Sequence, residues 1–173
     1  MDGLGRAPTH PTQAQVEVLM GSYGFIGLAE MLDESFVVLA HILQIELADV
    51  LFLDAKTPGT KDFFCVGRNC STMTFSGHPK FEDEPDEVQA HVKGPFAVRN
   101  ELDYLLYDAV RERLHHQMQT IPHFDQQLTT YKAMRQKANA LCGNFTRRDD
   151  CYWMDNGCGY KCMDTLPFTG KQY

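Results

Sequence analysis

The stretch from Tyr23 to Lys56 reads YGFIGLAEMLDESFVVLAHILQIELADVLFLDAK, and it decides the fold that the sequence predicts. It opens with an apolar run, residues 23–29, which is typical of a strand buried on both faces of a parallel sheet. Asp33 follows as a candidate helix N-cap, and the apolar residues after it recur at helical spacing. A second apolar run, residues 50–53, predicts another strand. The stretch therefore predicts a β-α-β unit with a right-handed crossover, and hence an α/β fold.

Two long amphipathic helices are predicted downstream of this unit. Pro95 opens the first, whose apolar residues recur every three or four positions as far as Leu114. Pro122 interrupts the pattern, and a second helix is predicted from Phe124 to Leu141. Upstream of the β-α-β unit, residues 11–19 predict a short helix.

The remaining segments are expected to be irregular. Residues 57–95 are rich in Gly, Pro, Ser and Thr and predict a long connection. Its acidic run, residues 82–87, predicts a solvated loop that leads into a short helix. We therefore expect a tail over residues 1–10, one domain over residues 11–142 and a cysteine-rich extension over residues 143–173.

Composition and charge limit the classes of function. The chain has 173 residues, of which 43% are hydrophobic and 23% charged, as in an ordinary globular domain. The net charge of -7 argues against a nucleic-acid partner, because phosphate binding requires clustered Lys and Arg. No apolar run approaches the ~20 residues of a membrane span, and the first residues lack the apolar core of a signal peptide.

Three blocks of this sequence resemble one enzyme family. Residues 27–56 are similar to the hydrophobic-A-E-x-x-D-E-S-hydrophobic-V-L-L block of the galactose-3-O-sulfotransferases, the group that includes cerebroside sulfotransferase. The segment NELDYLLYDAV, residues 100–110, resembles the family's later N-x-L-D-x-x-L-Y helix. The segment MRQKANALC, residues 134–142, resembles its C-terminal helix ending in cysteine. The resemblance covers roughly residues 14–56 and 95–142, in family order.

The resemblance implies a function and a location. It implies a partial P-loop-type sulfotransferase fold that transfers sulfate from 3′-phosphoadenylyl sulfate to the 3-hydroxyl of galactose. The implied acceptor is a glycolipid or glycan, as in galactosylceramide sulfation and glycolipid biosynthesis. The family's members are Golgi type II membrane glycoproteins. Membrane attachment is therefore expected only through an N-terminal anchor that this sequence does not contain.

The donor-binding half of such an enzyme is not recognisable here. Sulfuryl transfer needs a backbone-amide loop for the donor phosphates, a cation for the leaving oxygen and a base for the acceptor hydroxyl. No phosphate loop precedes Tyr23, and residues 57–61 have a similar composition but no predicted helix after them. We therefore interpret the chain as the C-terminal part of a sulfotransferase, expected to be inactive alone and to bind the donor poorly.

Other functions stay open. Uronyl 2-O-sulfotransferases carry a similar E-x-x-E-S helix, so the acceptor could be a uronyl sugar. The chain could also be a truncated, inactive relative that acts as a secreted, disulfide-stapled interaction module. A zinc-binding interaction domain is a third reading.

Glu30 is the candidate catalytic residue, because the predicted fold places it at the carboxyl end of a buried strand, where open α/β sheets bind ligands. It is expected to position the acceptor hydroxyl or support the base; its structural alternative is an ion pair with a basic side chain. Lys56 follows the second strand and could face the same cleft. Asn100, Asp103 and Tyr107 share one face of the first long helix. They are candidates for binding sugar hydroxyls, or for hydrogen bonds back to the sheet.

Six cysteines and two glycosylation sequons, together with the family resemblance, favour an oxidising lumen. Cys65 and Cys70 are separated by four residues and are expected to bridge a small loop. The other four lack the paired C-x-x-C spacing of zinc modules, so disulfides are favoured over a metal and no metal ligand is predicted. These four are Cys142, Cys151, Cys158 and Cys162, and the sequons begin at Asn69 and Asn144.

Overall fold

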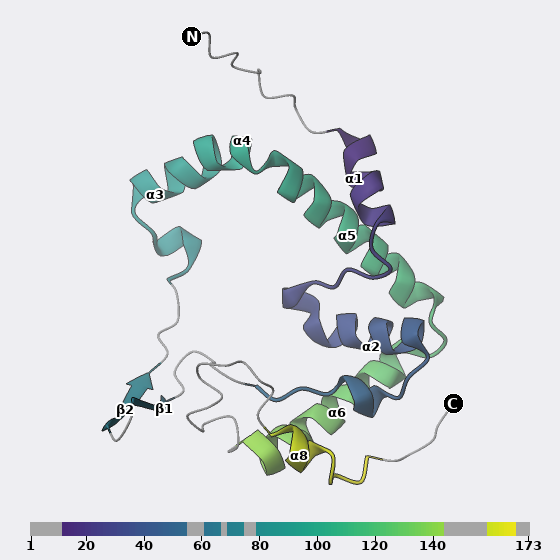
Figure 1. Ribbon diagram of the computed structural model, residues 1–173. Helices are drawn as coiled ribbons and strands as arrows, with labels where there is room; N and C mark the ends of the chain where they lie inside the picture. The colour runs from purple at the N-terminus through teal and green to yellow at the C-terminus, as the bar shows by residue number, and fades with distance from the viewer. Residues whose placement is uncertain (1–11, 55–60, 67–68, 75–78, 144–158, 169–173) are drawn as a thin grey trace, which may run out of the picture. The chain divides into compact units, whose positions relative to one another are not determined.

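The computed structural model describes residues 12–54, 61–66, 69–74, 79–143 and 159–168 (Figure 1). The chain divides into two compact units, each built from two separate stretches of sequence. The first unit comprises Met1–Ser35 and Pro79–Thr120, and the second comprises Phe36–His78 and Ile121–Tyr173.

Among the described residues of the first unit, all regular structure is helical. Helix α1 spans Gln13–Gly21, and the 3-10 turn η1 spans Ala29–Met31, just before helix α2 (Leu32–Leu43) begins. The later stretch carries η3 (Phe81–Asp83), α3 (Asp86–His91), η4 (Val92–Phe96), α4 (Ala97–Arg99) and α5 (Glu101–Thr120). Segment η4 is a π-helical turn that contains Pro95, whose ring removes one backbone donor.

Helix α1 packs along α5 in this unit (Figure 1). Val16 on α1 and Val110 and Leu114 on α5 are buried. The guanidinium of Arg113 donates a hydrogen bond of 3.0 Å to the carbonyl of Met20, near the end of α1. Apolar burial therefore holds the two helices together, and the guanidinium adds a charged donor to a carbonyl at the helix end that also accepts the backbone N–H of Tyr23.

The second unit contains the rest of α2, η2 (Leu47–Val50), β1 (Lys61–Val66), β2 (Asn69–Thr74), α6 (Phe124–Cys142) and α8 (Tyr160–Met163). Tyr131 on α6 is fully buried, and its hydroxyl donates a hydrogen bond of 2.9 Å to the carbonyl of Val50. A disulfide joins Cys142, the last residue of α6, to Cys162 on α8. Helix α6 is thus linked to η2 by a hydrogen bond and to α8 by a disulfide.

The predicted α/β fold and its β-α-β unit are wrong. Residues 23–28 form no strand and lead into η1, and Val50 ends η2 while residues 51–53 are likewise outside any strand. The strands among the described residues are β1 and β2, which form an antiparallel hairpin in the connection expected to be irregular. A partial P-loop-type sheet is therefore absent from the part of the chain that the structure describes.

A local contact explains why the first apolar run is not a strand. The backbone N–H of Leu28 donates to the side-chain hydroxyl of Ser35 at 3.0 Å, and that hydroxyl lies 3.3 Å from the carbonyl of Leu28. The carbonyl of Leu28 also accepts the N–H of Met31 in η1, so both backbone groups of Leu28 are satisfied locally rather than by a neighbouring strand. Gly27 lies so close to Ser35 that a Cβ at position 27 would approach its Cβ to 3.0 Å.

Within the described parts of the chain, no helix combines the length and the apolar character needed to cross a membrane.

Candidate functional site

The structure brings together two of the residues that the sequence singled out. Glu30 lies in η1 and is exposed to solvent, while Tyr107 projects from the middle of α5. The phenolic hydroxyl of Tyr107 donates a hydrogen bond to Oε1 of Glu30. These residues belong to the first and second blocks of the family resemblance, so the fold of this unit joins the two blocks at one point.

Electrostatics fix the protonation states of this pair. The hydrogen bond from Tyr107 lowers the pKa of Glu30, and the nearby positive charge of Arg111 lowers it further. The same hydrogen bond raises the pKa of Tyr107. At neutral pH the pair therefore consists of an ionised carboxylate and a neutral phenol.

Arg111 extends the pair along the surface of α5. Its guanidinium lies 5.8 Å from the centroid of the Tyr107 ring, one helical turn away. It also pairs with the carboxylate of Asp108 at 3.3 Å, and both side chains are largely exposed. The phenol of Tyr107 is therefore close to one guanidinium and two carboxylates. These four residues are called the Tyr107 cluster: Glu30, Tyr107, Asp108 and Arg111.

The setting of Glu30 differs from the one predicted for it. It does not end a buried parallel strand, because η1 stands where that strand was expected. A carboxylate with a lowered pKa is a weak proton acceptor but a good acceptor of hydrogen bonds. The geometry therefore favours a carboxylate that holds a hydroxyl group over one that removes its proton.

The other candidate binding residues do not join the cluster. Asn100 lies between α4 and α5, and its side-chain amide donates a hydrogen bond of 2.8 Å to the carbonyl of Phe96, the last residue of η4. Asn100 therefore serves the backbone at a helix junction. Asp103 lies exposed on α5, one turn before Tyr107. Lys56 lies outside the described residues.

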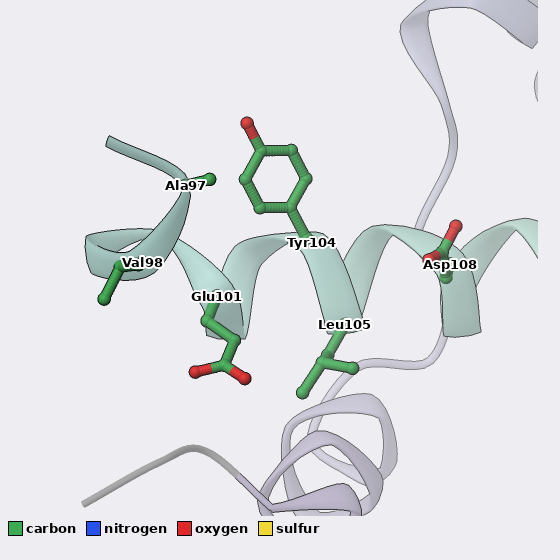
Figure 2. A pocket seen from close by; sticks show the side chains of 6 residues that line it. All are labelled: Ala97, Val98, Glu101, Tyr104, Leu105 and Asp108. Atoms are coloured by element: carbon green, nitrogen blue, oxygen red, sulfur yellow. The ribbon is translucent and has the colours of Figure 1, made fainter. Parts of the chain in front are cut away.

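A shallow hollow of about 390 Å³ lies along α4 and the start of α5. Its lining combines apolar side chains with two carboxylates, and Figure 2 shows Tyr104 standing on one side of the helix with Glu101 and Leu105 on the other. The full lining is Ala97, Val98, Glu101, Tyr104, Leu105 and Asp108. Asp108 belongs both to this hollow and to the Tyr107 cluster. The sequence prediction missed Tyr104, which lies within the N-x-L-D-x-x-L-Y segment, and Asp108, which directly follows that segment.

Neither a metal site nor a donor site is built from the described residues. No group of three or more His, Cys, Asp or Glu side chains among them could hold a metal ion. Lys61, the last residue of the segment compared with a phosphate loop, begins strand β1, whereas a phosphate loop is followed by a helix.

The described residues include some of the cysteines and one of the two sequon asparagines. Cys142 and Cys162 form a disulfide, and both belong to the four later cysteines for which the sequence favoured disulfides over a metal. Cys65 on β1 stands opposite Cys70 on β2 in the backbone register, and Asn69 is the first residue of β2. Cys151, Cys158 and Asn144 lie outside the described residues.

No family model, curated protein or solved structure matches this chain.

Proposed function

We propose that this chain is the acceptor-binding, C-terminal portion of a carbohydrate sulfotransferase of the Golgi lumen. The reaction is the transfer of sulfate from 3′-phosphoadenylyl sulfate to the 3-hydroxyl of a galactose on a glycolipid or glycan. The single observation that carries this proposal is the hydrogen bond from Tyr107 to Glu30. It links two residues that lie in separate blocks of the family resemblance.

The Tyr107 cluster has the chemistry that a sugar acceptor requires. The ionised carboxylate of Glu30 retains lone pairs beyond the one used by Tyr107, so it can accept a hydrogen bond from a sugar hydroxyl. The phenol oxygen of Tyr107 can accept another from a neighbouring hydroxyl of the same ring. Since both residues are exposed, a sugar can reach them without rearrangement of this unit.

In this proposal Glu30 orients the acceptor hydroxyl. As sulfuryl transfer proceeds, the attacking oxygen loses its proton and the transferred group moves from the donor phosphate to that oxygen. A carboxylate that already accepts a hydrogen bond from the hydroxyl fixes the direction of its lone pair toward the donor. Glu30 is therefore a binding residue here, and the base and the donor loop belong to the donor-binding half.

A galactoside titration tests this proposal. The full chain, labelled with ¹⁵N, is titrated with methyl β-galactoside and with its 3-O-methyl derivative. We expect amide shifts around Glu30 and Tyr107 with the first sugar, and binding weakened about tenfold, ~1.4 kcal/mol, when 3-O-methylation removes one hydroxyl donor. Glu30→Gln and Tyr107→Phe are expected to weaken galactoside binding by a similar factor.

Matched controls make the same two substitutions at other positions of the same unit. Glu112→Gln and Tyr23→Phe alter exposed residues outside the cluster and should leave galactoside binding unchanged. Equal binding of both sugars, or binding that none of the cluster variants affects, would refute the role of the cluster. A chain that binds no galactoside and gains no transferase activity with a donor-binding half supplied would instead support the inactive interaction module.

A further inference from the structure

The hairpin formed by β1 and β2 places two cysteines opposite one another. Its antiparallel register pairs Val66 with Asn69 and Cys65 with Cys70, with residues 67 and 68 as the connection. The pair that flanks a two-residue connection is of the hydrogen-bonded type, so the next pair, Cys65 and Cys70, is of the non-hydrogen-bonded type. Cα atoms in such a pair are about 4.5 Å apart, within the range of about 4.4–6.8 Å that a disulfide spans.

The same strand carries a glycosylation sequon. Asn69-Cys70-Ser71 forms the start of β2, so Cys70 is both the middle residue of the sequon and the register partner of Cys65. While the hairpin is paired, residues 69–71 are held extended against residues 64–66. Sequons are modified where the chain is exposed in surface loops, so a strand that is fixed in a ladder is a poor acceptor.

From this placement we infer that a Cys65–Cys70 disulfide and a glycan on Asn69 are mutually exclusive: the disulfide closes the hairpin and excludes the glycan, and the open hairpin accepts it. An isolated two-stranded hairpin is at best marginally stable in water. Strands β1 and β2 contact each other far more than they contact any other described element. Closing this short loop with a disulfide favours the paired form by on the order of tenfold or more.

Both modifications balance chemically. In the first, the thiols of Cys65 and Cys70 lose two protons and two electrons and form one S–S bond. A disulfide-bearing oxidant, such as an oxidoreductase or oxidised glutathione, takes up the electrons and becomes a dithiol. In the second, the amide nitrogen of Asn69 bonds to the anomeric carbon of a lipid-pyrophosphate-linked oligosaccharide. The bond from that carbon to the pyrophosphate breaks, the nitrogen loses one proton and the lipid pyrophosphate departs.

The inference requires only passage through an oxidising, glycosylating lumen, which a cleavable secretory leader supplies for the full chain. Its failure would therefore leave the sulfotransferase proposal standing, and the reverse also holds. Trypsin cleaves after Lys61, Arg68 and Lys80, which separates Cys65 and Cys70 onto two peptides, residues 62–68 and 69–80. Non-reducing mass spectrometry then reports, in one measurement, whether these peptides are linked and whether Asn69 carries a glycan.

Cys65→Ala is the decisive variant, because it removes the disulfide and leaves the sequon intact. We expect the secreted parent chain to show mainly linked peptides with Asn69 unmodified. Glycan occupancy at Asn69 should rise at least threefold in Cys65→Ala, and also in the parent chain when a reductant is added during synthesis. Asn144, in the second sequon, is the internal control, and its occupancy should not change.

Two results would overturn the inference. One is a substantial population of linked peptides that also carry the Asn69 glycan, since the two states would then coexist. The other is equal Asn69 occupancy in the parent chain and in Cys65→Ala. To exclude a new pairing of the freed Cys70 thiol as the cause, the Cys65→Ala/Cys70→Ala double variant should show the same raised occupancy as the single variant.

Discussion

Tyr107 and Glu30 are 77 residues apart in the sequence and are joined by a hydrogen bond from the phenol to the carboxylate. The bond ties the middle of α5 to the turn that precedes α2. It opposes the ionisation of Tyr107 and favours that of Glu30, because only a neutral phenol can donate and a carboxylate accepts best. The pair therefore couples two protonation equilibria at one exposed point of the first unit.

The coupling predicts a shifted tyrosine titration. Glu30→Gln should lower the pKa of Tyr107 toward its ordinary value of 10.0, since the negative acceptor is lost. The measurement is the pH titration of the ¹³Cζ resonance of Tyr107 in the parent chain and in Glu30→Gln. An unchanged Tyr107 titration in Glu30→Gln would show that the hydrogen bond is absent in solution.

The same shifts set the pH range in which the pair stabilises the first unit. The pKa of Glu30 is lowered on folding, so its contribution is present above the ordinary value of 4.5 and is lost as pH falls through the folded-state pKa. The pKa of Tyr107 is raised on folding, so its contribution is present below 10.0 and is lost as pH rises through the folded-state pKa. In urea unfolding between pH 3 and 11, Tyr107→Phe should therefore differ most from the parent chain at intermediate pH and converge with it at both ends. A constant difference across this range would contradict the coupling.

Ser35 provides a test of the first unit's packing. Its hydroxyl is buried and satisfies both backbone groups of Leu28, at 3.0 and 3.3 Å. Ser35→Ala leaves the buried N–H of Leu28 without a partner, while the carbonyl of Leu28 keeps its bond from the N–H of Met31, so the free energy of unfolding should fall by about 1–3 kcal/mol. Ser22→Ala is the matched control, because Ser22 is exposed at the end of α1 and should change stability by no more than ~0.5 kcal/mol. Equal effects of the two variants in urea denaturation would reject the structural role of Ser35.

The helices of this protein could be predicted from the sequence, and the sheet could not. Apolar spacing predicted helices that correspond to α5 and α6, because an amphipathic helix carries its period within one segment. Residues 11–19 predicted a helix that appears as α1, and the acidic run leads into α3 as expected. The first long helix begins at Glu101 rather than Pro95, because Asn100 leaves the helical conformation.

The strand predictions failed for a different reason. An apolar run shows only that a segment is buried, and whether it becomes a strand depends on a neighbour elsewhere in the chain. In the first run, the backbone of Leu28 is hydrogen-bonded to the hydroxyl of Ser35. In the second, Phe52 packs on Phe36 with ring centroids 5.2 Å apart. The hairpin that does form lies in a segment that is rich in turn residues and was therefore predicted to be irregular. Its signal was two short runs, residues 61–66 and 69–74, separated by two residues beginning with Gly67.

The sequence predicted some residues of the candidate site but not the contacts between them. The resemblance selected Glu30 and Tyr107, but their contact depends on how η1 meets α5, which no local pattern encodes. Arg111 follows Tyr107 by four residues on the same helix face, and Asp108 precedes Arg111 by three, so both could have been found from their spacing. Asn100 was selected with Tyr107, yet its amide serves the carbonyl of Phe96. A shared helix face therefore did not imply a shared role.

Tyr131 tests the packing of the second unit. It is fully buried on α6 and donates its hydroxyl to the carbonyl of Val50 at 2.9 Å, at the end of η2. Tyr131→Phe keeps the ring and removes the donor, so it should lower the free energy of unfolding by about 1–2 kcal/mol. Tyr160→Phe removes the same atom at an exposed position of the same unit and should have little effect. If Tyr131→Phe proved as stable as the parent chain, the hydrogen bond would contribute nothing to this unit.

The disulfide between Cys142 and Cys162 joins residues that are 20 positions apart in the sequence. Helix α8 has four residues, too few to be stable alone, so we expect it to depend on its attachment to α6. Lys137 on α6 also lies 5.6 Å from the ring centroid of Phe168, which adds a second, weaker contact to the same segment. Cys162→Ala should therefore lower the free energy of unfolding of the second unit by about 3 kcal/mol, as expected for a loop of this length.

Hydrogen exchange locates that effect. In Cys162→Ala the amides of Met163 and Asp164, which donate within and just after α8, should lose their protection, while the middle of α6 around Tyr131 keeps it. The Cys65→Ala/Cys70→Ala variant is the control, because it removes two other cysteines of this unit and should leave α8 protected. Protection of α8 that survives in Cys162→Ala would mean that packing, including the contact of Lys137 with Phe168, holds this segment without the disulfide. In that case the loss of stability should instead appear when Phe168 is replaced by Ala.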